Sequence, residues 1–511
     1  MSESPAAGDP RPEKGVPATT TDPETAGQDP AVVGKPWMYK PFKLGPITLP
    51  YFASPEFQLV LVSFVCFLCP GMFNAVSGLG GGGQLKTADV SNANTALYSA
   101  FAVVGFFAGS VANRIGLRLT LSFGGFGYFI YVASLLSYNH NENAGFLIFA
   151  GALLGVCAGL LWSAQGAVMM SYPSETEKGK FIAIFWVIFN LGGVIGSLVP
   201  LGQNMHSTAG RVNDGTYIAF MVLMALGFVL CWFLSDSKYI VRKDGSRVII
   251  MKHPTWKSEF LGLYETLRTD YWIVLMFPMF LASNWFSGYH FNAVNGAYFT
   301  IRTRSLNNLL YWLMQMVAAY LFGITLDLKL LSRPMRARLN LGLLMALLMA
   351  IWGGGYAFQK TYTRDSVSEE TAVDWTDSGY IGPMFLYMFY GFIDAAFQTC
   401  AYWFMGALTN NGRKLANYAG FYKGIQSAGA AGMWRLDAEA TSYMIEFASS
   451  WGLVAGSLII AAPVILFKIK EHTDVEADLA FSDETAQEVQ GHAVKNQPVA
   501  EQSYEKQAPV S

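Results

Sequence analysis

Apolar residues dominate this chain in continuous runs of about 20 residues, the length that crosses a bilayer as a helix. The runs do not alternate with polar residues, which favours helices over strands. A helix also satisfies its own backbone hydrogen bonds in lipid, where no water is available. The pattern therefore predicts an all-α membrane protein with about twelve transmembrane helices.

The polar links between these runs divide the chain into two groups of six spans. We expect the spans at 58–77, 94–112, 119–138, 145–170, 181–201, 217–234, 271–294, 309–325, 339–358, 380–408, 418–434 and 443–467. The expected units are a disordered segment 1–50, a six-helix half 51–235, a central loop 236–270, a second six-helix half 271–467 and a disordered tail 468–511. Within the central loop, apolar residues at helical spacing over 258–267 predict an interfacial helix.

The basic residues predict the orientation of the chain. Links after even-numbered spans carry more than twice as many Lys and Arg as links after odd-numbered spans. The positive-inside rule then places both termini in the cytosol, with the links 359–379 and 78–93 on the opposite side. Which membrane holds the protein does not follow from this pattern.

The two halves read as copies of each other. Gly109 and Asn113 near the end of the second span align with Gly323 and Asp327 near the end of the eighth. A second alignment lays 185–196 on 421–432 and matches several glycines. Because glycine-rich apolar runs also align by chance, the alternative is that no repeat exists. A true repeat predicts two parallel six-helix units around a central site.

Composition narrows the function classes. Only 14% of the residues are charged, against about 25% in soluble proteins, and no basic tract suggests nucleic acid. All five cysteines lie inside apolar runs, and Cys66-x-x-Cys69 has no nearby histidine to complete a metal site. Gly78-x-Gly80-x-x-Gly83 matches a dinucleotide pattern, but it follows a membrane span and not a strand, so we interpret it as a flexible turn or a close helix crossing. We expect no cofactor, no metal and no enzyme activity, because no catalytic Ser/His or carboxylate pair is evident.

Several longer motifs resemble a known family. The sequence from Gly105 through Gly109 to Asn113-Arg114-Ile115-Gly116-Leu117-Arg118 is similar to the major-facilitator signature, with Asn113 where that signature usually has Asp. More specific are CPGMFNAVSGLGGGGQ at 69–84, FNAVNGAYFTIRTR at 291–304 and YKGIQSAGAAG at 422–432. These motifs resemble the fungal branch of the Unc-ninety-three-like family, a divergent group of the major facilitator superfamily. The resemblance covers about 50–470.

The resemblance implies a major-facilitator fold but little about the substrate. In that fold the first, fourth, seventh and tenth spans line a central cavity. Some animal members of the family regulate channels or act as trafficking chaperones for receptors, so a membrane-protein partner is one expectation. The lipid bilayer and a small solute are the others.

Asp394 is the main candidate for a substrate or proton site, because a carboxylate at bilayer depth is costly unless it faces water or other helices. Gln398 lies one helical turn further and shares its face. Beside them we expect cavity residues from the other lining spans: Asn74, Trp162, Gln165 and Asn284. The alternative is a purely structural role for Asp394 in hydrogen bonds between helices.

Lys423, Gln426 and Asn190 are further candidates in the eleventh and fifth spans. Lys423 lies near the cytosolic end of the predicted span, so it could snorkel to the interface, pair with Asp394 or another carboxylate, or bind an anionic substrate. Gly193, Gly196, Gly429 and Gly432 are interpreted as sites of close helix packing.

Two gates are predicted at the ends of the bundle. His290, Asn292 and Asn295 near the outer end of the seventh span are candidates for an outer gate, although a lone histidine at such a position is more often a satisfied interface residue. At the cytosolic end, we predict a latch that holds one access state closed. Its residues are Asn113, Arg114, Arg118, Asp327 and Arg333, unless these charges only determine topology.

Two functions remain open from the sequence. The first is a secondary transporter that moves a small solute by alternating access, with protons as a candidate coupling ion. The second is a non-transporting adaptor or regulator of a channel or receptor. A water-accessible pocket that contains Asp394 would favour the first function, and a centre filled by aromatic side chains would favour the second.

Overall fold

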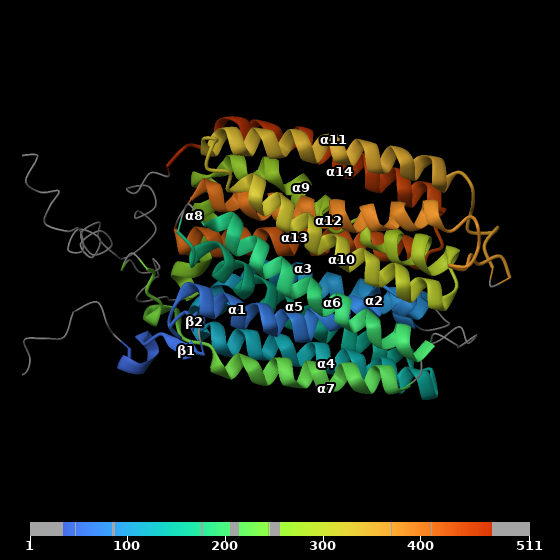
Figure 1. The fold of residues 1–511 in the computed structure, drawn as a ribbon, viewed down its shortest axis with the longest axis horizontal. Helices are drawn as coiled ribbons and strands as arrows, with labels where there is room; N and C mark the ends of the chain where they lie inside the picture. Colours follow the sequence, from blue (N-terminus) through green and yellow to red (C-terminus); the bar gives the residue numbers. More distant parts are fainter. Residues whose placement is uncertain are drawn as a thin grey trace, which may run out of the picture.

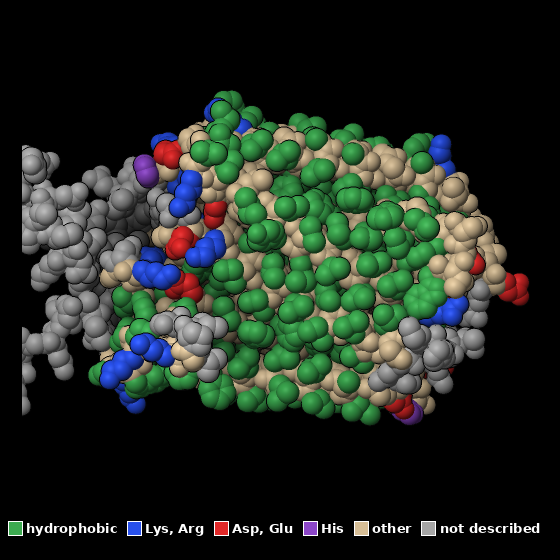
Figure 2. All heavy atoms as spheres, viewed as in Figure 1, with side chains coloured by type: hydrophobic (Ala, Val, Ile, Leu, Met, Phe, Trp, Pro, Cys, Tyr) green, Lys and Arg blue, Asp and Glu red, His purple; other side chains and the backbone are tan. Residues whose placement is uncertain are grey.

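Long helices lie side by side and nearly antiparallel in the computed structural model, which describes residues 34–45, 47–83, 87–174, 177–204, 214–243, 245, 256–368, 370–409 and 411–472 (Figure 1). Eight helices in the described residues are long and apolar enough to cross a membrane. Apolar side chains cover the flank of the bundle in a broad band, and charged side chains gather at its two ends (Figure 2). This is the surface that a bilayer requires.

The described residues of the first half form α1 (Pro55–Cys66), η3 (Phe67–Gly71), α2 (Met72–Ser77), η4 (Gly81–Gly83), α3 (Thr87–Ile115), α4 (Leu117–Asn141), α5 (Ala144–Ser171), α6 (Lys178–Asn204), α7 (Asp214–Leu230) and η5 (Cys231–Phe233). Those of the second half form η7 (Tyr271–Met276), α9 (Phe277–Ala282), η8 (Tyr289–Gly296), α10 (Ile301–Leu326), α11 (Arg333–Gln359), α12 (Ile381–Leu408), α13 (Gly412–Ala438) and α14 (Tyr443–Phe467). Between the halves lie η6 (Ser237–Tyr239) and α8 (Trp256–Thr269).

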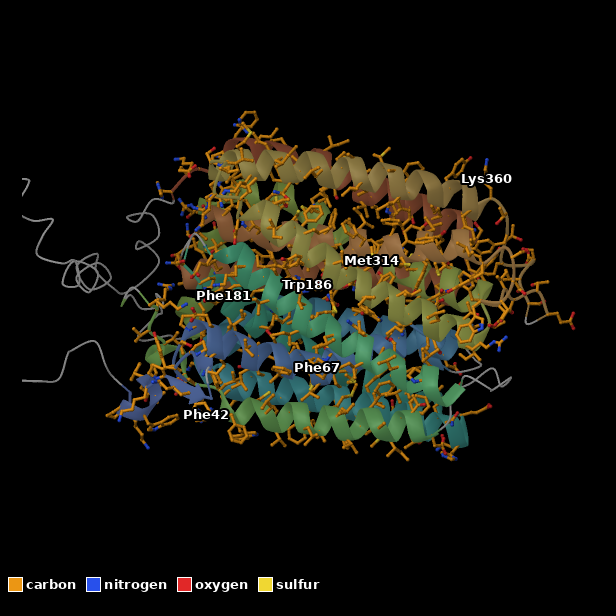
Figure 3. The ribbon with its side chains drawn as sticks, in the orientation of Figure 1. Phe42, Phe67, Phe181, Trp186, Met314 and Lys360 are labelled. Carbon is orange, nitrogen blue, oxygen red and sulfur yellow. The ribbon has the colours of Figure 1, made fainter. Side chains whose placement is uncertain are left out.

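The chain segments that precede α1 and follow α14 lie at the same end of the bundle, which we call the terminal face (Figure 1). The opposite end, which carries the link between α11 and α12, is the distal face. Phe42 lies at the terminal face and Lys360 at the distal face, whereas Trp186 and Met314 lie between them in the bundle (Figure 3).

Part of the segment 1–50, for which we expected disorder, is ordered. Residues Pro36–Tyr39 form η2, and β1 (Phe42–Leu44) pairs antiparallel with β2 (Ile47–Leu49). The hydroxyl of Tyr39 donates to the backbone oxygen of Tyr239 at 3.0 Å, so contacts with the central loop fix this segment. Residues 1–33 and 473–511 lie outside the described part.

Four helices begin well before the positions that the apolar runs predict. The second, eighth, ninth and eleventh spans are expected from 94, 309, 339 and 418, but their helices begin at Thr87, Ile301, Arg333 and Gly412. The added turns are polar, and hydropathy therefore did not include them. Asn411, in the link between the expected tenth and eleventh spans, is the N-cap of α13 and accepts a hydrogen bond from the backbone N–H of Lys414 at 3.0 Å.

The first span of each half departs from a regular α-helix. In the first span, Pro70 lies within the π-helical turn η3, which accommodates its missing N–H. The seventh span, expected over 271–294, is interrupted between α9 and η8 by a turn at 283–286. There the hydroxyls of Ser283 and Ser287 donate to the backbone oxygens of Phe280 and Asn284, which competes with helical pairing.

The two halves meet along two helix pairs, α3 with α13 and α6 with α10. The alignment of the two halves in the sequence lays α3 on α10 and α6 on α13, so it superposes one of these pairs on the other. Glycine makes the approach close, because a Cβ at Gly105 would lie 2.8 Å from the backbone nitrogen of Gly424 in α13. Gly193, one of the predicted packing glycines, faces the indole of Trp312 in α10, where a Cβ would lie 2.7 Å from Cγ.

Candidate functional site

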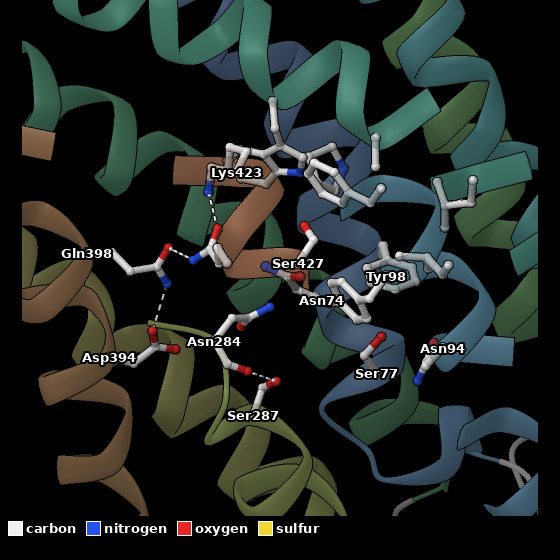
Figure 4. A pocket seen from close by; sticks show the side chains of 18 of the residues that line it. Asn74, Ser77, Asn94, Tyr98, Asn284, Ser287, Asp394, Gln398, Lys423 and Ser427 are labelled. Carbon is white, nitrogen blue, oxygen red and sulfur yellow. Dashed lines mark hydrogen bonds between the residues drawn. The ribbon is translucent and has the colours of Figure 1, made fainter. Parts of the chain in front are cut away.

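A cavity of about 90 Å³ lies between the two halves, and side chains from both halves surround it (Figure 4). This volume holds several water molecules but is below the ~300 Å³ at which ligand pockets usually begin. Seven of the nine predicted substrate or proton-site residues line it: Asn74, Trp162, Asn284, Asp394, Gln398, Lys423 and Gln426.

Gln165 and Asn190 do not line the cavity. The amide nitrogen of Gln165 contacts the sulfur of Met169 at 3.4 Å, and its oxygen has no partner within the described residues. Both amide atoms of buried Asn190 also lack a partner there. Their helices α5 and α6 border the cavity, but these two side chains are buried outside the cavity wall.

Asp394 lies in the middle of α12, is only 6% exposed and has hydrogen bonds to both carboxylate oxygens. Oδ2 accepts from the Tyr311 hydroxyl at 2.8 Å and from the amide of Gln315 at 2.9 Å. Oδ1 accepts from the amide of Gln398 at 2.8 Å. Three donors therefore replace the water that this carboxylate would otherwise bind.

Two glutamine side chains continue from Asp394 to Lys423. The oxygen of Gln398 accepts from the amide nitrogen of Gln426 at 3.1 Å, and the oxygen of Gln426 accepts from the Lys423 ammonium at 2.8 Å (Figure 4). The chain of hydrogen bonds connects a buried acid to a buried base without an ion pair between them.

Of the three roles considered for Lys423, snorkelling to the interface does not fit the structure. Because α13 begins at Gly412, Lys423 lies about three turns inside the helix, and it is only 4% exposed. Its nitrogen lies 4.5 Å from the ring centroid of Trp162 and 5.0 Å from that of Tyr422. These aromatic faces supply the electrostatic contact that water would otherwise provide.

His290 does not belong to an outer gate. Its Nδ1 lies 3.3 Å from the Tyr311 hydroxyl, and its ring stacks on Tyr390 with centroids 4.3 Å apart. Its Nε2 has no partner among the described residues. His290 instead contacts aromatic side chains of the second half, and the Tyr311 hydroxyl connects it to Asp394.

Asn292 and Asn295 do join the two halves near the distal face. The amide nitrogen of Asn292 donates to Asp437 at 2.6 Å, and its oxygen accepts from the backbone N–H of Gly81 at 3.1 Å. The amide nitrogen of Asn295 donates to the backbone oxygen of Gly78 at 2.9 Å. The turn after α2 is thus held against η8.

Asp437 is the centre of this distal contact. Besides Asn292, it accepts from the hydroxyl of Ser91 in α3 at 3.0 Å and forms an ion pair with Arg364 at 3.0 Å. Arg364 also pairs with Glu446 in α14 at 2.8 Å. The distal contact therefore links α3 of the first half with α13, α14 and η8 of the second.

The glycine turn permits this closure. Gly80, Gly81, Gly82 and Gly83 all have φ between 55° and 80°, a region that other residues rarely adopt. A Cβ at Gly80 would lie 2.8 Å from the Cα of Gly296 in the second half. The interpretation of Gly78-x-Gly80-x-x-Gly83 as a turn at a close crossing agrees with this geometry.

The terminal face is closed by contacts that partly replace the predicted latch. The carboxylate of Asp327, at the end of α10, accepts from the backbone N–H groups of Gly179 and Lys180 at 3.1 and 2.7 Å. It thereby caps α6 of the other half. The buried Lys178 ammonium donates to the backbone oxygens of Gly406 and Thr409 at the end of α12, at 2.6 and 3.2 Å.

The arginines of the predicted latch have other partners. Arg118 donates to the backbone oxygen of Leu234 within its own half, at 2.7 Å. The backbone N–H of Arg333 donates to the carboxylate of Glu471, just after α14, and its guanidinium donates to the backbone oxygen of Gly406 in the second half. Arg114 is exposed, and the side chain of Asn113 lies outside the described part. Only Asp327 of the five residues makes a described contact across the halves.

Two carboxyl groups outside the spans have shifted pKa values. Burial raises the pKa of Asp327 above its ordinary value, and the two backbone N–H donors oppose this shift. Asp374, in the distal link, has a pKa well below its ordinary value because Arg302 binds its carboxylate at 2.6 and 2.7 Å.

Within the described residues, no group of three or more His, Cys, Asp or Glu side chains could hold a metal ion. The five cysteines are free thiols, and all are buried. Cys69 contacts the backbone oxygen of Met224 at 3.6 Å, which fits a packing role.

Several cavity residues were missed from the sequence. Asn94 and Tyr98 come from α3, and Trp312 and Gln315 come from α10, whereas the lining is expected from the first, fourth, seventh and tenth spans. Tyr311, which also belongs to α10, contacts Asp394 in α12. The signal that could have identified them is the run of amides and aromatic residues at helical spacing along the eighth span.

Comparisons with known proteins agree with this architecture. The family model described as Major Facilitator Superfamily matches residues 59–433. An UNC93-like protein of Schizosaccharomyces pombe is 55% identical over 441 residues, which cover 86% of this chain and 87% of that protein. The chain is an UNC93-like member of the major facilitator superfamily. UNC93-like protein 1 of Arabidopsis thaliana is 44% identical over 84% of this chain and 93% of its own length.

Solved major-facilitator structures share the fold. The proton:xylose symporter XylE aligns with a TM-score of 0.60 at 12% identity, covering 82% of this chain and 98% of the symporter. The transporter FucP in its outward conformation aligns with a TM-score of 0.55 at 11% identity, over 81% of this chain and 99% of FucP. This UNC93-like chain is therefore a transporter-like, multi-pass membrane protein.

Proposed function

We propose that this UNC93-like protein is a secondary carrier that moves a small solute across its membrane by alternating access. The observation that supports this most directly is the enclosed cavity between the halves, with Asp394 and Lys423 in its wall. A carrier needs a binding site that both sides of the membrane can reach in turn. A cavity on the boundary between two repeated units is such a site.

The contacts at the two faces supply the gates for this cycle. Asp327 and Lys178 close the terminal face, and Asn292 and Asp437 close the distal face. Because both sets of contacts are in place, we assign this conformation to a closed state between the two open ones. We assign the terminal face to the cytosol, because Lys and Arg gather there (Figure 2).

We further propose that a proton is the coupling ion. Asp394 is the carboxylate in the described cavity wall, and its position beside Lys423 lets one proton change the charge balance of the site. Gln398 and Gln426 connect the two groups, so protonation of Asp394 would alter the hydrogen bonds along the whole chain. The substrate contacts would then differ between the protonated and unprotonated states, as coupling requires.

Reconstitution into liposomes tests this function. Purified protein is inserted into vesicles that enclose a pH-sensitive dye, and a panel of small solutes is added outside with and without an imposed pH gradient. We expect one solute class to enter in a saturable manner and to carry protons with it. Solute entry that depends on the protein but not on the pH gradient would contradict proton coupling and would support the carrier function. A complete lack of solute and proton flux would contradict the function.

The small volume of the cavity favours a second candidate, an adaptor that binds another membrane protein. Aromatic side chains fill much of the space around the cavity, including Trp186, Phe189 and Trp312. In an adaptor this packing would be permanent. A partner recovered by cross-linking in membranes, together with absent flux in vesicles, would favour this candidate.

A further inference from the structure

The charges of the cavity wall already have partners. Asp394 and Lys423 are the charged residues among the described lining side chains, and they are opposite in sign. Three donors bind the carboxylate, while Gln426 and aromatic faces surround the ammonium. A charged solute would thus enter a buried site that offers it no unused opposite charge, which is unfavourable.

Neutral polar groups in the same wall do have unused capacity. The oxygen of Gln315, a residue only 1% exposed, has no hydrogen-bond partner within the described residues. The side chains of Asn74, Ser77 and Ser427 also make no hydrogen bond with the described protein and line the cavity (Figure 4). Amides and hydroxyls both donate and accept, and a solute hydroxyl does the same.

These unused groups lie on both sides of the cavity. Asn74 and Ser77 belong to α2 in the first half, whereas Gln315 and Ser427 belong to α10 and α13 in the second. A flat heterocycle presents its polar atoms only in the plane of its ring. A solute whose hydroxyl groups point in several directions matches donors and acceptors that approach from both sides.

Aromatic side chains complete the wall. Trp186 and Phe189 line the cavity from the first half, and Phe291 and Trp312 from the second. Such faces pack against C–H groups, while amides bind hydroxyls between them. The lining therefore combines apolar surfaces with neutral hydrogen-bonding groups.

We infer that the solute of this cavity is a small neutral polyol, such as a monosaccharide or sugar alcohol, which Asn74, Ser77, Gln315 and Ser427 bind through hydroxyl groups. The inference rests on the proposed function, in that the cavity is the solute site. Asp394 and Lys423 then balance charge and are not the principal contacts of the solute.

Binding to the purified protein tests this inference without requiring transport. Trp162, Trp186, Trp312 and Trp434 line the cavity, so their fluorescence reports occupancy. Protein in detergent is titrated with hexoses, hexitols and glycerol, and separately with amino acids, dicarboxylates, polyamines and nucleobases. We expect a saturable fluorescence change with one or more polyols and none with the other classes.

Variants locate the polyol in the cavity. Ser427→Ala and Gln315→Leu should each weaken binding by about 3- to 10-fold, the effect of one lost hydrogen bond. Ser197→Ala is the matched control, because its hydroxyl donates to the backbone oxygen of Gly193 in α6 and is not part of the cavity wall. The Ser197 variant should bind like the wild type.

The outcomes separate the inference from the carrier function. Polyol binding without uptake into proteoliposomes would support the solute class and contradict the carrier. Saturable binding or uptake of an amino acid, a nucleobase or an ion other than the coupled proton would overturn the solute class. The same conclusion would follow if no polyol bound at any concentration tested, or if Ser427→Ala and Gln315→Leu bound like the Ser197 control.

Discussion

Asp394 and Lys423 are connected through the amides of Gln398 and Gln426, so a buried acid and a buried base share one hydrogen-bonded chain without direct contact. Each charge reduces the cost of burying the other, since both lie in the same poorly solvated space. The arrangement also leaves the cavity wall electrically balanced. Removing one charge should therefore cost more than removing both.

The charge balance can be measured with a double-mutant cycle. Asp394→Asn and Lys423→Met should each lower the stability of the protein, because each leaves one unbalanced buried charge. The double variant should be more stable than the sum of the two losses, by about 0.5–3 kcal/mol. Denaturant unfolding in detergent gives the four stabilities. Strict additivity would show that the two charges do not interact.

Asp394→Asn should also uncouple solute movement from protons. Asparagine can keep part of the hydrogen bonding to Tyr311 and Gln398 but cannot exchange a proton at physiological pH. We expect exchange of solute across vesicles to continue, while accumulation driven by a pH gradient is lost. Asp365→Asn, in the exposed distal link, is the control and should accumulate solute normally. If the Asp394 variant still accumulated solute under a pH gradient, Asp394 would not be the coupling residue.

The apolar runs were sufficient to predict the helices, because each run must be helical in lipid, whereas the two-lobed fold was predicted from the repeat and the family resemblance. They could not show where the helices end. Lys423 was placed near an interface because hydropathy starts the span at 418, while the helix starts at Gly412. The polar first turns of α13 are stabilised by packing and capping, which the hydropathy pattern does not record.

The candidate site was predicted in part for a similar reason. Asp394 and Gln398 share a helix face, and helical periodicity alone placed them together. Tyr311 and Gln315 contact the same carboxylate from another helix, and only the three-dimensional packing brings them there. Asp327 was identified from the repeat, yet its partner is a backbone helix terminus, which no pairing of charges in the sequence could indicate.

Loss of the Lys178 contact should open the terminal face. The ammonium of Lys178 holds the end of α12 through Gly406 and Thr409, and Lys178→Met removes these hydrogen bonds. We expect a cysteine introduced at Ser427 to react faster with a membrane-impermeant maleimide applied from the terminal side. The labelling rate is measured in vesicles whose outer surface carries the terminal face. Protein that contains only the native cysteines gives the background labelling.

Lys180→Met is the matched control for this experiment, because its side chain is half exposed and pairs only with nearby Glu177 at 3.2 Å among described contacts. Labelling of the Lys180 variant should match the wild type. Equal labelling rates for the Lys178 and Lys180 variants would mean that Lys178 does not hold the face closed.

A side chain at Gly80 should keep the distal face open. Gly80→Ala must place a Cβ 2.8 Å from the Cα of Gly296 and also adopt φ +80°, so the turn cannot close as tightly. Gly116→Ala shares the unfavourable φ, +86°, but meets nothing within 4 Å. Both variants carry backbone strain from the positive φ, of about 1–3 kcal/mol, whereas the steric clash is specific to Gly80.

Labelling from the distal side separates these two effects. In vesicles whose outer surface carries the distal face, the Gly80 variant should expose a cysteine at Ser427 to impermeant reagent, whereas the Gly116 variant should not. Both variants should melt at lower temperature than the wild type. If Gly80→Ala left distal labelling unchanged, the contact between Gly80 and Gly296 would have no role in closure.

Acid should weaken the distal link through Asp374. Arg302 lowers the pKa of Asp374 well below its ordinary value of 3.8, and the hydroxyls of Thr300 and Thr376 also bind the carboxylate. Because the folded-state pKa is the lower one, the stability from this group is present above pH 3.8 and is lost as the pH falls further. Melting temperatures between pH 6 and about 3 should therefore decline, and Asp374→Asn should make the decline shallower. Asp365→Asn, in the same link, controls for the loss of one negative charge, and an equal slope in both variants would show that the Arg302 contact does not stabilise the fold.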